Sequence, residues 1–326
     1  MHYPEVQKFN ATYGYEYEMA DVLLLDAAKA VYEKQGVDFD LWRDRGMAMD
    51  TKLRDYDIYT VASDVTWNTN GSKSLESVYD PELDEVVPMK KANRHLCQTA
   101  ELTSPVLEYN KIDEEWSDFE EWFSLMQSLG GVVSPWHWND FNVHIGIDGW
   151  DLDDLKQHVE WQREVWEPLT DFRHYVDITD HFSPKKYPWN DTVYTRFMAA
   201  KDVEEAWYVY RQNQPRRTTD EPVHWSAFWK KLHPADPSSF LNPELPHNTL
   251  EWRVWPLVDD TDILKELVEF SVKNTHDPMP YDEVVEWVEY WGNKSAYMRD
   301  KKPDNLNRTR QTKPYKGRLP ELKKVD

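Results

Sequence analysis

Residues Asn10 to Asp21 read NATYGYEYEMAD, and the alternation of side chains in this stretch decides how the fold begins. Tyrosine recurs at every second position from Tyr13 to Tyr17, which is the period of a β-strand. Glu16 and Glu18 are also two residues apart, so both belong to the opposite face of that strand. We therefore expect a strand with one aromatic face and one carboxylate face.

Further strand and helix patterns follow this stretch along the chain. Period-two alternation predicts strands within residues 55–64, 96–105, 139–148 and 247–256. Apolar residues at helical spacing predict helices within residues 20–36, 113–129, 151–166, 202–213, 261–273 and 281–299. No internal repeat and no linker divides these elements. The prediction is one α+β domain over residues 1–298, built on an antiparallel β-sheet with flanking helices.

The charge of the chain is unevenly distributed. The whole chain has a net charge of -22, and residues 299–326 hold ten Lys/Arg against four Asp/Glu, a net of +6. Residues 1–298 therefore carry -22 - 6 = -28. We expect a basic, flexible C-terminal tail, because this segment has few apolar residues. An acidic body repels nucleic acid and anionic membranes, so only the tail is expected to contact phosphate backbones.

Other features of the composition concern the cellular location. The only cysteine, Cys97, excludes an internal disulfide, and the first residues lack the apolar run of a secretory signal. No stretch approaches the roughly 18 apolar residues of a membrane span. These observations predict a cytoplasmic protein that does not enter membranes.

Four of the expected strands carry polar or charged residues on the face opposite their apolar residues. These residues are Glu16 and Glu18, Glu101, Asn142 and His144, and Glu251 and Arg253. Taken singly, Glu16 and Glu18 are typical of a solvated strand face. Glu101 alone is typical of ordinary surface or a salt bridge, and His144 alone of a hydrogen-bonded core or surface histidine. Glu251 and Arg253 could simply pair with neighbours across the sheet. Several carboxylates that converge would raise one another's pKa values unless a positive charge lay among them. Arg253 and divalent metal are the candidates, and oxygen ligands with one imidazole suit Mg²⁺ or Mn²⁺, as in an ATP site.

The order of these motifs resembles that of the amidoligase family, carboxylate–amine ligases related to glutamate–cysteine ligase and glutamine synthetase. GYEYEM resembles the opening Gly-x-Glu-x-Glu strand of the family, and AELTSP resembles its Glu-x-x-Ser-Pro segment. FNVHIGID is similar to its His-x-His strand, and TLEWRVWP to its Thr-hydrophobic-Glu-aromatic-Arg strand. Asp64 stands where the family has an aspartate, whereas Asn142 replaces the first histidine of His-x-His.

The resemblance implies a fold like the glutamine synthetase catalytic domain and an ATP-dependent ligase that forms an amide through an acyl phosphate. The substrates would be a small-molecule or peptide carboxylate and an amine, and members of the family often occur in phages, which would place the protein in the host cytoplasm. The implied ligands of Mg²⁺ or Mn²⁺ are Glu16, Glu18, Glu101, His144 and Glu251. The implied nucleotide contacts are Arg253, His144, Asn142 and Asp64, and the implied catalytic residues are Glu16, Glu251 and Arg253.

Three other functions remain compatible with the same residues. A metal-dependent hydrolase or nuclease would use the same acidic cluster, although the acidic body disfavours a nucleic-acid substrate. A glycosidase would need two carboxyls flanking a cleft and would leave Arg253 without a role. The replacement at Asn142 also suits a catalytically impaired interaction module that docks through the basic tail.

Overall fold

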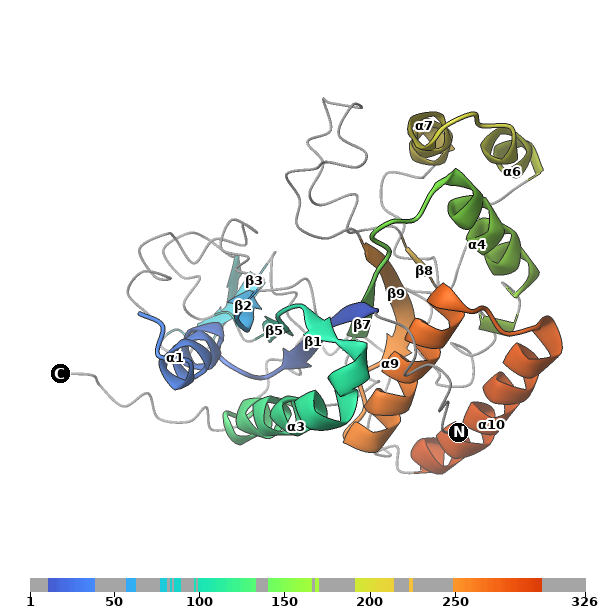
Figure 1. Cartoon of the computed structure of the whole chain (residues 1–326). Helices are drawn as coiled ribbons and strands as arrows, with labels where there is room; N and C mark the ends of the chain where they lie inside the picture. Colours follow the sequence, from blue (N-terminus) through green and yellow to red (C-terminus); the bar gives the residue numbers. More distant parts are fainter. Residues whose placement is uncertain are drawn as a thin grey trace. The chain divides into compact units, whose positions relative to one another are not determined.

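The computed structural model describes residues 11–38, 57–62, 77–80, 83, 85–88, 97, 99–132, 140–165, 168–169, 191–213, 223–224 and 249–300 (Figure 1). Its chain forms two compact units. The first consists of Met1–Glu16, Val106–Trp116 and Asp140–Lys301, and the second of Tyr17–Pro105, Ser117–Asn139 and Lys302–Asp326. The fold is α+β, with an antiparallel sheet and flanking helices, as the sequence predicts. Of the predicted tail, residues 299–326, all but the first two residues lie outside the described part of the chain.

The first unit contains the strands that carry the candidate site. Strand β1 (Thr12–Ala20) enters this unit with its residues up to Glu16. The strand order is β1-β7-β9-β8, and the short β6 pairs with the beginning of β1. The other strands of this unit are β6 (Leu107–Glu108), β7 (Asp140–Gly146), β8 (Val223–His224) and β9 (Thr249–Pro256). The pairs β6–β1, β7–β9 and β8–β9 are antiparallel.

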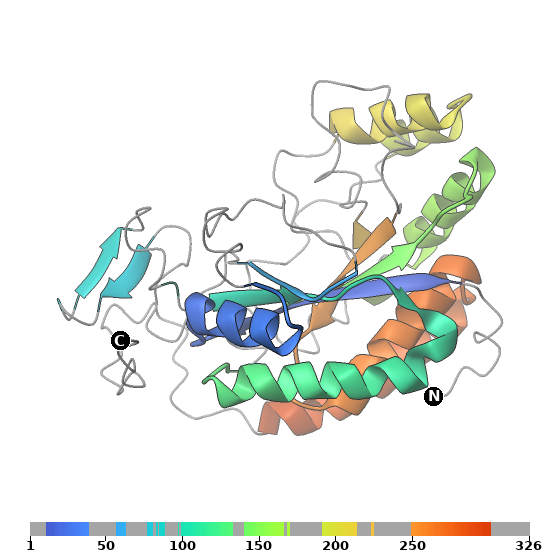
Figure 2. The ribbon, with the colours of Figure 1, turned by 60° about the vertical axis from the view of Figure 1, so that its left-hand side comes forward.

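The second unit contains the remainder of β1, followed by β5 (Thr99–Thr103) and β2 (Thr60–Ala62). Helix α1 (Leu24–Lys34) lies against β2 and β5, as Figure 2 shows. Strands β3 (Ser77–Asp80) and β4 (Glu85–Pro88) form a separate antiparallel pair, also visible in Figure 2. Both β2 and β5 fall within segments whose alternation predicts strands.

Strand β1 is buried on both faces, although one face carries aromatic side chains and the other carries acidic ones. Its aromatic face packs against α3 (Ile112–Ser128), which follows the short 3₁₀ turn η4 (Tyr109–Lys111). In the first unit, the ring of Tyr15 contacts Trp116 of α3. In the second unit, Tyr17 contacts two phenylalanines of α3 at centroid distances of 5.8 and 5.6 Å. The carboxylate face of β1 is nevertheless buried as well, because Glu16 is only 1% exposed.

Tryptophans form the core between β9 and the last two described helices of the first unit. These are α9 (Thr261–His276) and α10 (Tyr281–Asp300), which lie side by side in Figure 1. The phenyl ring of Phe270 on α9 and the indole of Trp287 on α10 are 3.9 Å apart between centroids. Large buried aromatic rings of this kind dominate the packing energy of a core.

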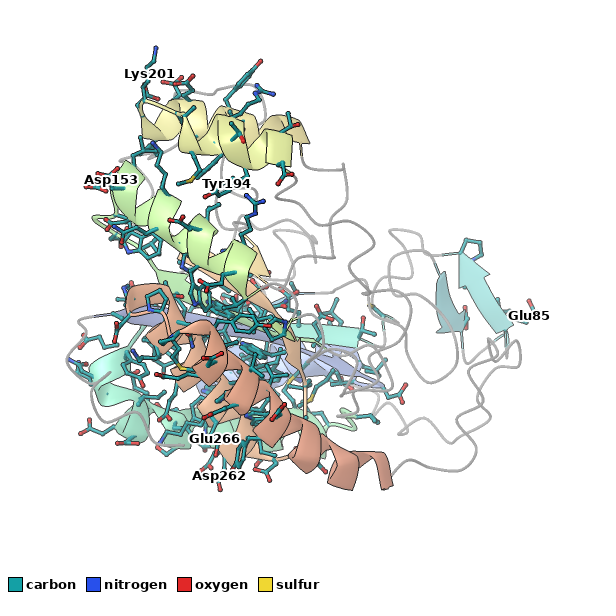
Figure 3. The ribbon with its side chains drawn as sticks, turned by 90° about the vertical axis from the view of Figure 1, so that its right-hand side faces the viewer. Glu85, Asp153, Tyr194, Lys201, Asp262 and Glu266 are labelled. Atoms are coloured by element: carbon teal, nitrogen blue, oxygen red, sulfur yellow. The ribbon has the colours of Figure 1, made fainter. Side chains whose placement is uncertain are left out.

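A smaller helical cluster joins α4 (Leu152–Glu164), α6 (Asp191–Met198) and α7 (Val203–Asn213). Tyr194 of α6, labelled in Figure 3, lies beneath the guanidinium of Arg163 at 4.2 Å from the ring centroid. Asp151 caps α4 by accepting backbone hydrogen bonds, and the Asp154 carboxylate accepts one from the Asp151 backbone. This capping box confirms the predicted helix start at Asp151.

Strand β9 contains a β-bulge that the sequence analysis does not anticipate. Phe141 pairs with Trp255 and Val143 with Trp252, so two residues of β9 lie opposite one residue of β7. As a result, the indoles of Trp252 and Trp255 stack with centroids 5.8 Å apart and planes inclined by only 4°. In a regular strand, residues three apart would occupy opposite faces. The simple alternation expected for residues 247–256 is therefore wrong beyond Trp252.

The sequence predicts that the chain contains no membrane-spanning segment, and the described helices agree with this. None of them combines sufficient length with sufficient apolarity to cross a bilayer.

Candidate metal centre

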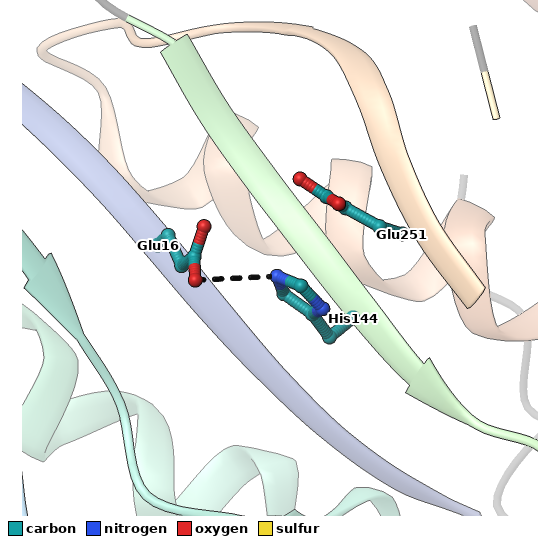
Figure 4. A group of neighbouring side chains, drawn as sticks. All are labelled: Glu16, His144 and Glu251. Atoms are coloured by element: carbon teal, nitrogen blue, oxygen red, sulfur yellow. Dashed lines mark ion pairs between the residues drawn. The ribbon is translucent and has the colours of Figure 1, made fainter. Parts of the chain in front are cut away.

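Three neighbouring strands of the first unit bring three of the predicted site residues together. Glu16 is on β1, His144 on β7 and Glu251 on β9, and His144 is directly opposite Glu251 in the antiparallel register. One donor atom from each residue lies within 4.8 Å of the other two (Figure 4). Residues separated by more than 230 positions in the sequence thus form one compact group of potential metal ligands.

The central residue of the group is His144, both of whose ring nitrogens have a neighbouring oxygen atom. Its Nε2 atom is 3.5 Å from Glu16 Oε1. Its Nδ1 atom is 3.4 Å from the hydroxyl oxygen of Thr249, the first residue of β9. A contact to the second ring nitrogen restricts the orientation of an imidazole, as commonly occurs for histidines that bind metals.

A glycine allows β1 to approach β7 closely beside this group. A Cβ atom added to Gly146 would lie only 2.1 Å from Thr12 Oγ1. A larger residue would therefore require the Thr12 side chain or the backbone to move. Gly146 is two residues after His144 on the same strand, so this close approach helps to hold Glu16 and His144 together.

Both carboxylates of the group are buried, which makes their negative charges costly unless they are compensated. Glu16 is 1% exposed and Glu251 is 0% exposed, while the His144 side chain is 13% exposed. Moving an ionised carboxylate out of water is costly unless opposite charge or hydrogen bonds compensate it. The interpretation of Glu16 as part of a solvated strand face, which its pattern alone favours, is therefore wrong.

The donor types and their separations fit a divalent cation. Two carboxylates would balance the charge of the ion, and the imidazole suits Mn²⁺ and related ions as well as Mg²⁺. Ligand atoms bonded to one ion at about 2.1 Å, with about 90° between them, lie roughly 3 Å apart. The 3.5 Å separation between His144 Nε2 and Glu16 Oε1 is slightly longer than this value. The three donor atoms lie within 4.8 Å of one another, so the side chains would have to move closer together to hold one ion.

Two other predicted metal ligands do not belong to this compact group. Glu18 and Glu101 are buried, at 4% and 8% exposed, and both lie in the second unit. The Glu101 carboxylate accepts a hydrogen bond from Thr103 Oγ1 at 3.5 Å. Within the described residues, the group with donor atoms in mutual reach is limited to Glu16, His144 and Glu251. Glu18 and Glu101 are therefore buried carboxylates outside this group, and their role as metal ligands stays a prediction.

The remaining predicted residues differ in how much of them the structure describes. Asp64 lies outside the described residues, and so does the side chain of Arg253, although its backbone belongs to β9. Asn142 is 2% exposed and precedes His144 by two positions on β7.

Two positions near the group were not assigned a role from the sequence. Thr249 belongs to the TLEWRVWP motif, and its place two residues before Glu251 was the available signal that it shares a strand face with that carboxylate. His224 is directly opposite Glu251 in the β8–β9 register. No local pattern around His224 predicts a strand, so this neighbour depends on long-range pairing.

Comparisons with protein-family models, with curated proteins and with solved structures find no match for this chain.

Proposed function

We propose that this chain is a metal- and ATP-dependent carboxylate–amine ligase. The observation that carries the proposal is the group of Glu16, His144 and Glu251, formed by three strands whose motifs resemble those of the amidoligase family. A metal that binds between two buried carboxylates offsets their charge and can bind oxygen atoms of phosphates. The residues present therefore fit the cation that such a reaction requires.

The proposed reaction has two steps. A substrate carboxylate attacks the γ-phosphorus of ATP, which forms an acyl phosphate and releases ADP. An amine then attacks the acyl carbon, which forms the amide, releases phosphate and transfers the ammonium proton to a base. The role of the protein in both steps is to hold the reactants in line and to stabilise the developing negative charge. By the resemblance, Glu16, Glu251 and Arg253 act at the reacting groups, and Asp64 contacts the nucleotide.

A coupled assay tests this proposal. The protein is incubated with ATP, Mg²⁺ or Mn²⁺, and pools of carboxylic acids and primary amines. We expect ADP and phosphate to appear only when an acid and an amine are both present. Release of ADP without an amine would indicate a hydrolase, and absence of divalent-cation binding by calorimetry would overturn the proposed metal centre.

A variant pair tests the contribution of one buried ligand. Glu251→Gln keeps the shape of the side chain but removes its charge, so we expect at least about a tenfold loss of Mn²⁺ affinity. Glu286→Gln is the matched control, because Glu286 is exposed on α10. Equal Mn²⁺ affinity of both variants in calorimetric titration would contradict the assignment of Glu251 as a ligand.

A further inference from the structure

Asn142 is a buried polar residue two positions before His144 on β7, and within the described part of the chain its side-chain oxygen accepts no hydrogen bond. The side chain is 2% exposed. Among the described residues, no donor forms a hydrogen bond with its Oδ1 atom. A buried carbonyl oxygen that accepts no hydrogen bond costs about 1–3 kcal/mol. Such an atom in a folded protein needs an explanation, and a bound cation is one.

The position of Asn142 on β7 associates it with the same face as His144. Side chains two residues apart on a strand project from one face, and their Cα atoms are roughly 6.5 Å apart. The bulge lies on β9 opposite Asn142, whereas the residues from Val143 to Gly146 pair with β9 in uninterrupted register. The alternation along β7 therefore still assigns Asn142 and His144 to one face.

The bulge lies opposite Asn142, next to the regular pair of His144 and Glu251. The two residues of β9 that lie opposite Asn142 are at positions 253 and 254, directly after the pair Trp252–Val143. A bulge interrupts the ladder and redirects the side chains next to it, and bulges are common beside active sites. The local irregularity thus lies opposite the residue whose buried side-chain oxygen accepts no hydrogen bond from the described residues.

We propose that Asn142 Oδ1 is a fourth ligand of the Glu16–His144–Glu251 metal centre, a proposal that rests on the metal centre of the proposed function. An amide oxygen is a hard neutral donor that suits Mg²⁺, Ca²⁺ and Mn²⁺. It adds a bond without adding charge, so the two carboxylates still balance a divalent ion. Asn142 is therefore a metal ligand rather than the nucleotide contact implied by the resemblance.

The donor set also defines which ion and which substrate groups the centre accepts. Three oxygens and one imidazole nitrogen favour Mn²⁺, which accepts both donor types. Four protein ligands leave two positions of an octahedral ion for oxygens of a bound molecule. Two adjacent phosphate oxygens, or one carboxylate, would occupy both positions.

Mn²⁺ itself is the probe for this inference. The six-line electron paramagnetic resonance signal of free Mn²⁺ decreases as the ion binds, and a titration of the full chain therefore reports its affinity. Asn142→Leu should weaken Mn²⁺ binding at least about tenfold, because it removes one ligand. Asn142→Asp supplies an oxygen at the same position and should bind Mn²⁺ at least as tightly as the unmodified protein.

A second buried asparagine provides the control. Both polar atoms of the Asn274 side-chain amide, on α9, form hydrogen bonds. Its Nδ2 donates to Phe270 O and its Oδ1 accepts from Met279 N, each at 2.9 Å. Asn274→Leu should lower stability to urea and leave Mn²⁺ affinity unchanged. If Asn142→Leu also leaves the affinity unchanged, this inference is overturned while the metal centre stands. If the unmodified protein binds no Mn²⁺, the metal centre of the proposed function fails.

Discussion

At the scale of single residues, two buried histidines make the stability of the folded chain depend on pH. His158 on α4 lies between Trp150 and Trp161, with ring centroids 5.4 Å from each. Burial lowers its pKa to about 3, and the nearby His276 contributes in the same direction. Burial also lowers the pKa of His276. Both imidazoles are therefore neutral in the folded protein under ordinary conditions.

The pKa of His158 leads to a prediction of acid sensitivity. An unfolded histidine has a pKa of about 6.5, so the unfolded chain binds this proton more readily than the folded one. The contribution of neutral, buried His158 to the free energy of unfolding is therefore complete above about pH 6.5. It is lost as the pH falls towards 3. At pH 5 the free energy of unfolding should be lower by about 2 kcal/mol from this group alone.

Urea denaturation at pH 7.5 and pH 5 measures this difference. His158→Phe keeps a flat aromatic ring between the two tryptophans and removes the titrating group, so its stability should change less between the two pH values. His276 is present in both proteins, so the effect of its own burial is common to them, and the difference between them reports His158 together with its coupling to His276. An equal loss of stability in both proteins would exclude His158 as the source.

At the scale of elements, β9 and α9 are joined through the polar atoms of the stacked tryptophans. The Trp255 indole donates to Ser271 Oγ at 2.8 Å, and the Trp252 indole donates to Thr275 Oγ1 at 3.0 Å. Both hydroxyls also donate to backbone carbonyls one turn earlier in α9. The two hydrogen bonds fix the bulged part of β9 against a helix that covers it.

We expect Ser271→Ala to lower the free energy of unfolding by about 1–3 kcal/mol, because it removes the acceptor of a buried indole N–H. Ser128→Ala is the matched control, since Ser128 also donates to a carbonyl of its own helix but is exposed. Ser128→Ala should change the free energy of unfolding by no more than about 0.5 kcal/mol. Urea titrations of both variants measure these changes, and equal values would show that the link between β9 and α9 adds no stability.

At the scale of the whole molecule, cation binding should stabilise the folded chain. A ligand that binds only the folded state at 100 times its dissociation constant adds about 2.7 kcal/mol to the free energy of unfolding. We expect such an increase with Mn²⁺ and its reversal by a chelator. The double variant Glu16→Gln with Glu251→Gln should not respond.

The double variant also separates specific binding from the general attraction of cations to an acidic protein. Its net charge changes by two, from -22 to -20, so any non-specific effect of Mn²⁺ remains nearly the same. Equal stabilisation of both proteins by Mn²⁺ in thermal denaturation would contradict a specific centre at Glu16 and Glu251.

The sequence by itself determined most local elements and the identities of the candidate ligands. Period-two alternation predicted β1, β7 and β9, and helical spacing predicted α1, α3, α4, α7, α9 and α10, because these patterns reflect which faces are buried. The Asp151 capping box was visible in the sequence because its hydrogen bonds involve residues close together in the chain. The polar faces of the expected strands indicated Glu16, His144 and Glu251 as candidate ligands.

Only the tertiary structure decided which polar faces meet. Glu16 and Glu18 look equivalent in the sequence, yet Glu16 joins His144 and Glu251 while Glu18 belongs to the second unit. The β9 bulge and the place of Asn142 opposite it depend on the pairing of two strands more than 100 residues apart. Local patterns cannot specify such a register, because strand pairing is set by packing across the whole sheet. The candidate metal centre is therefore a property of strand pairing as much as of its residues.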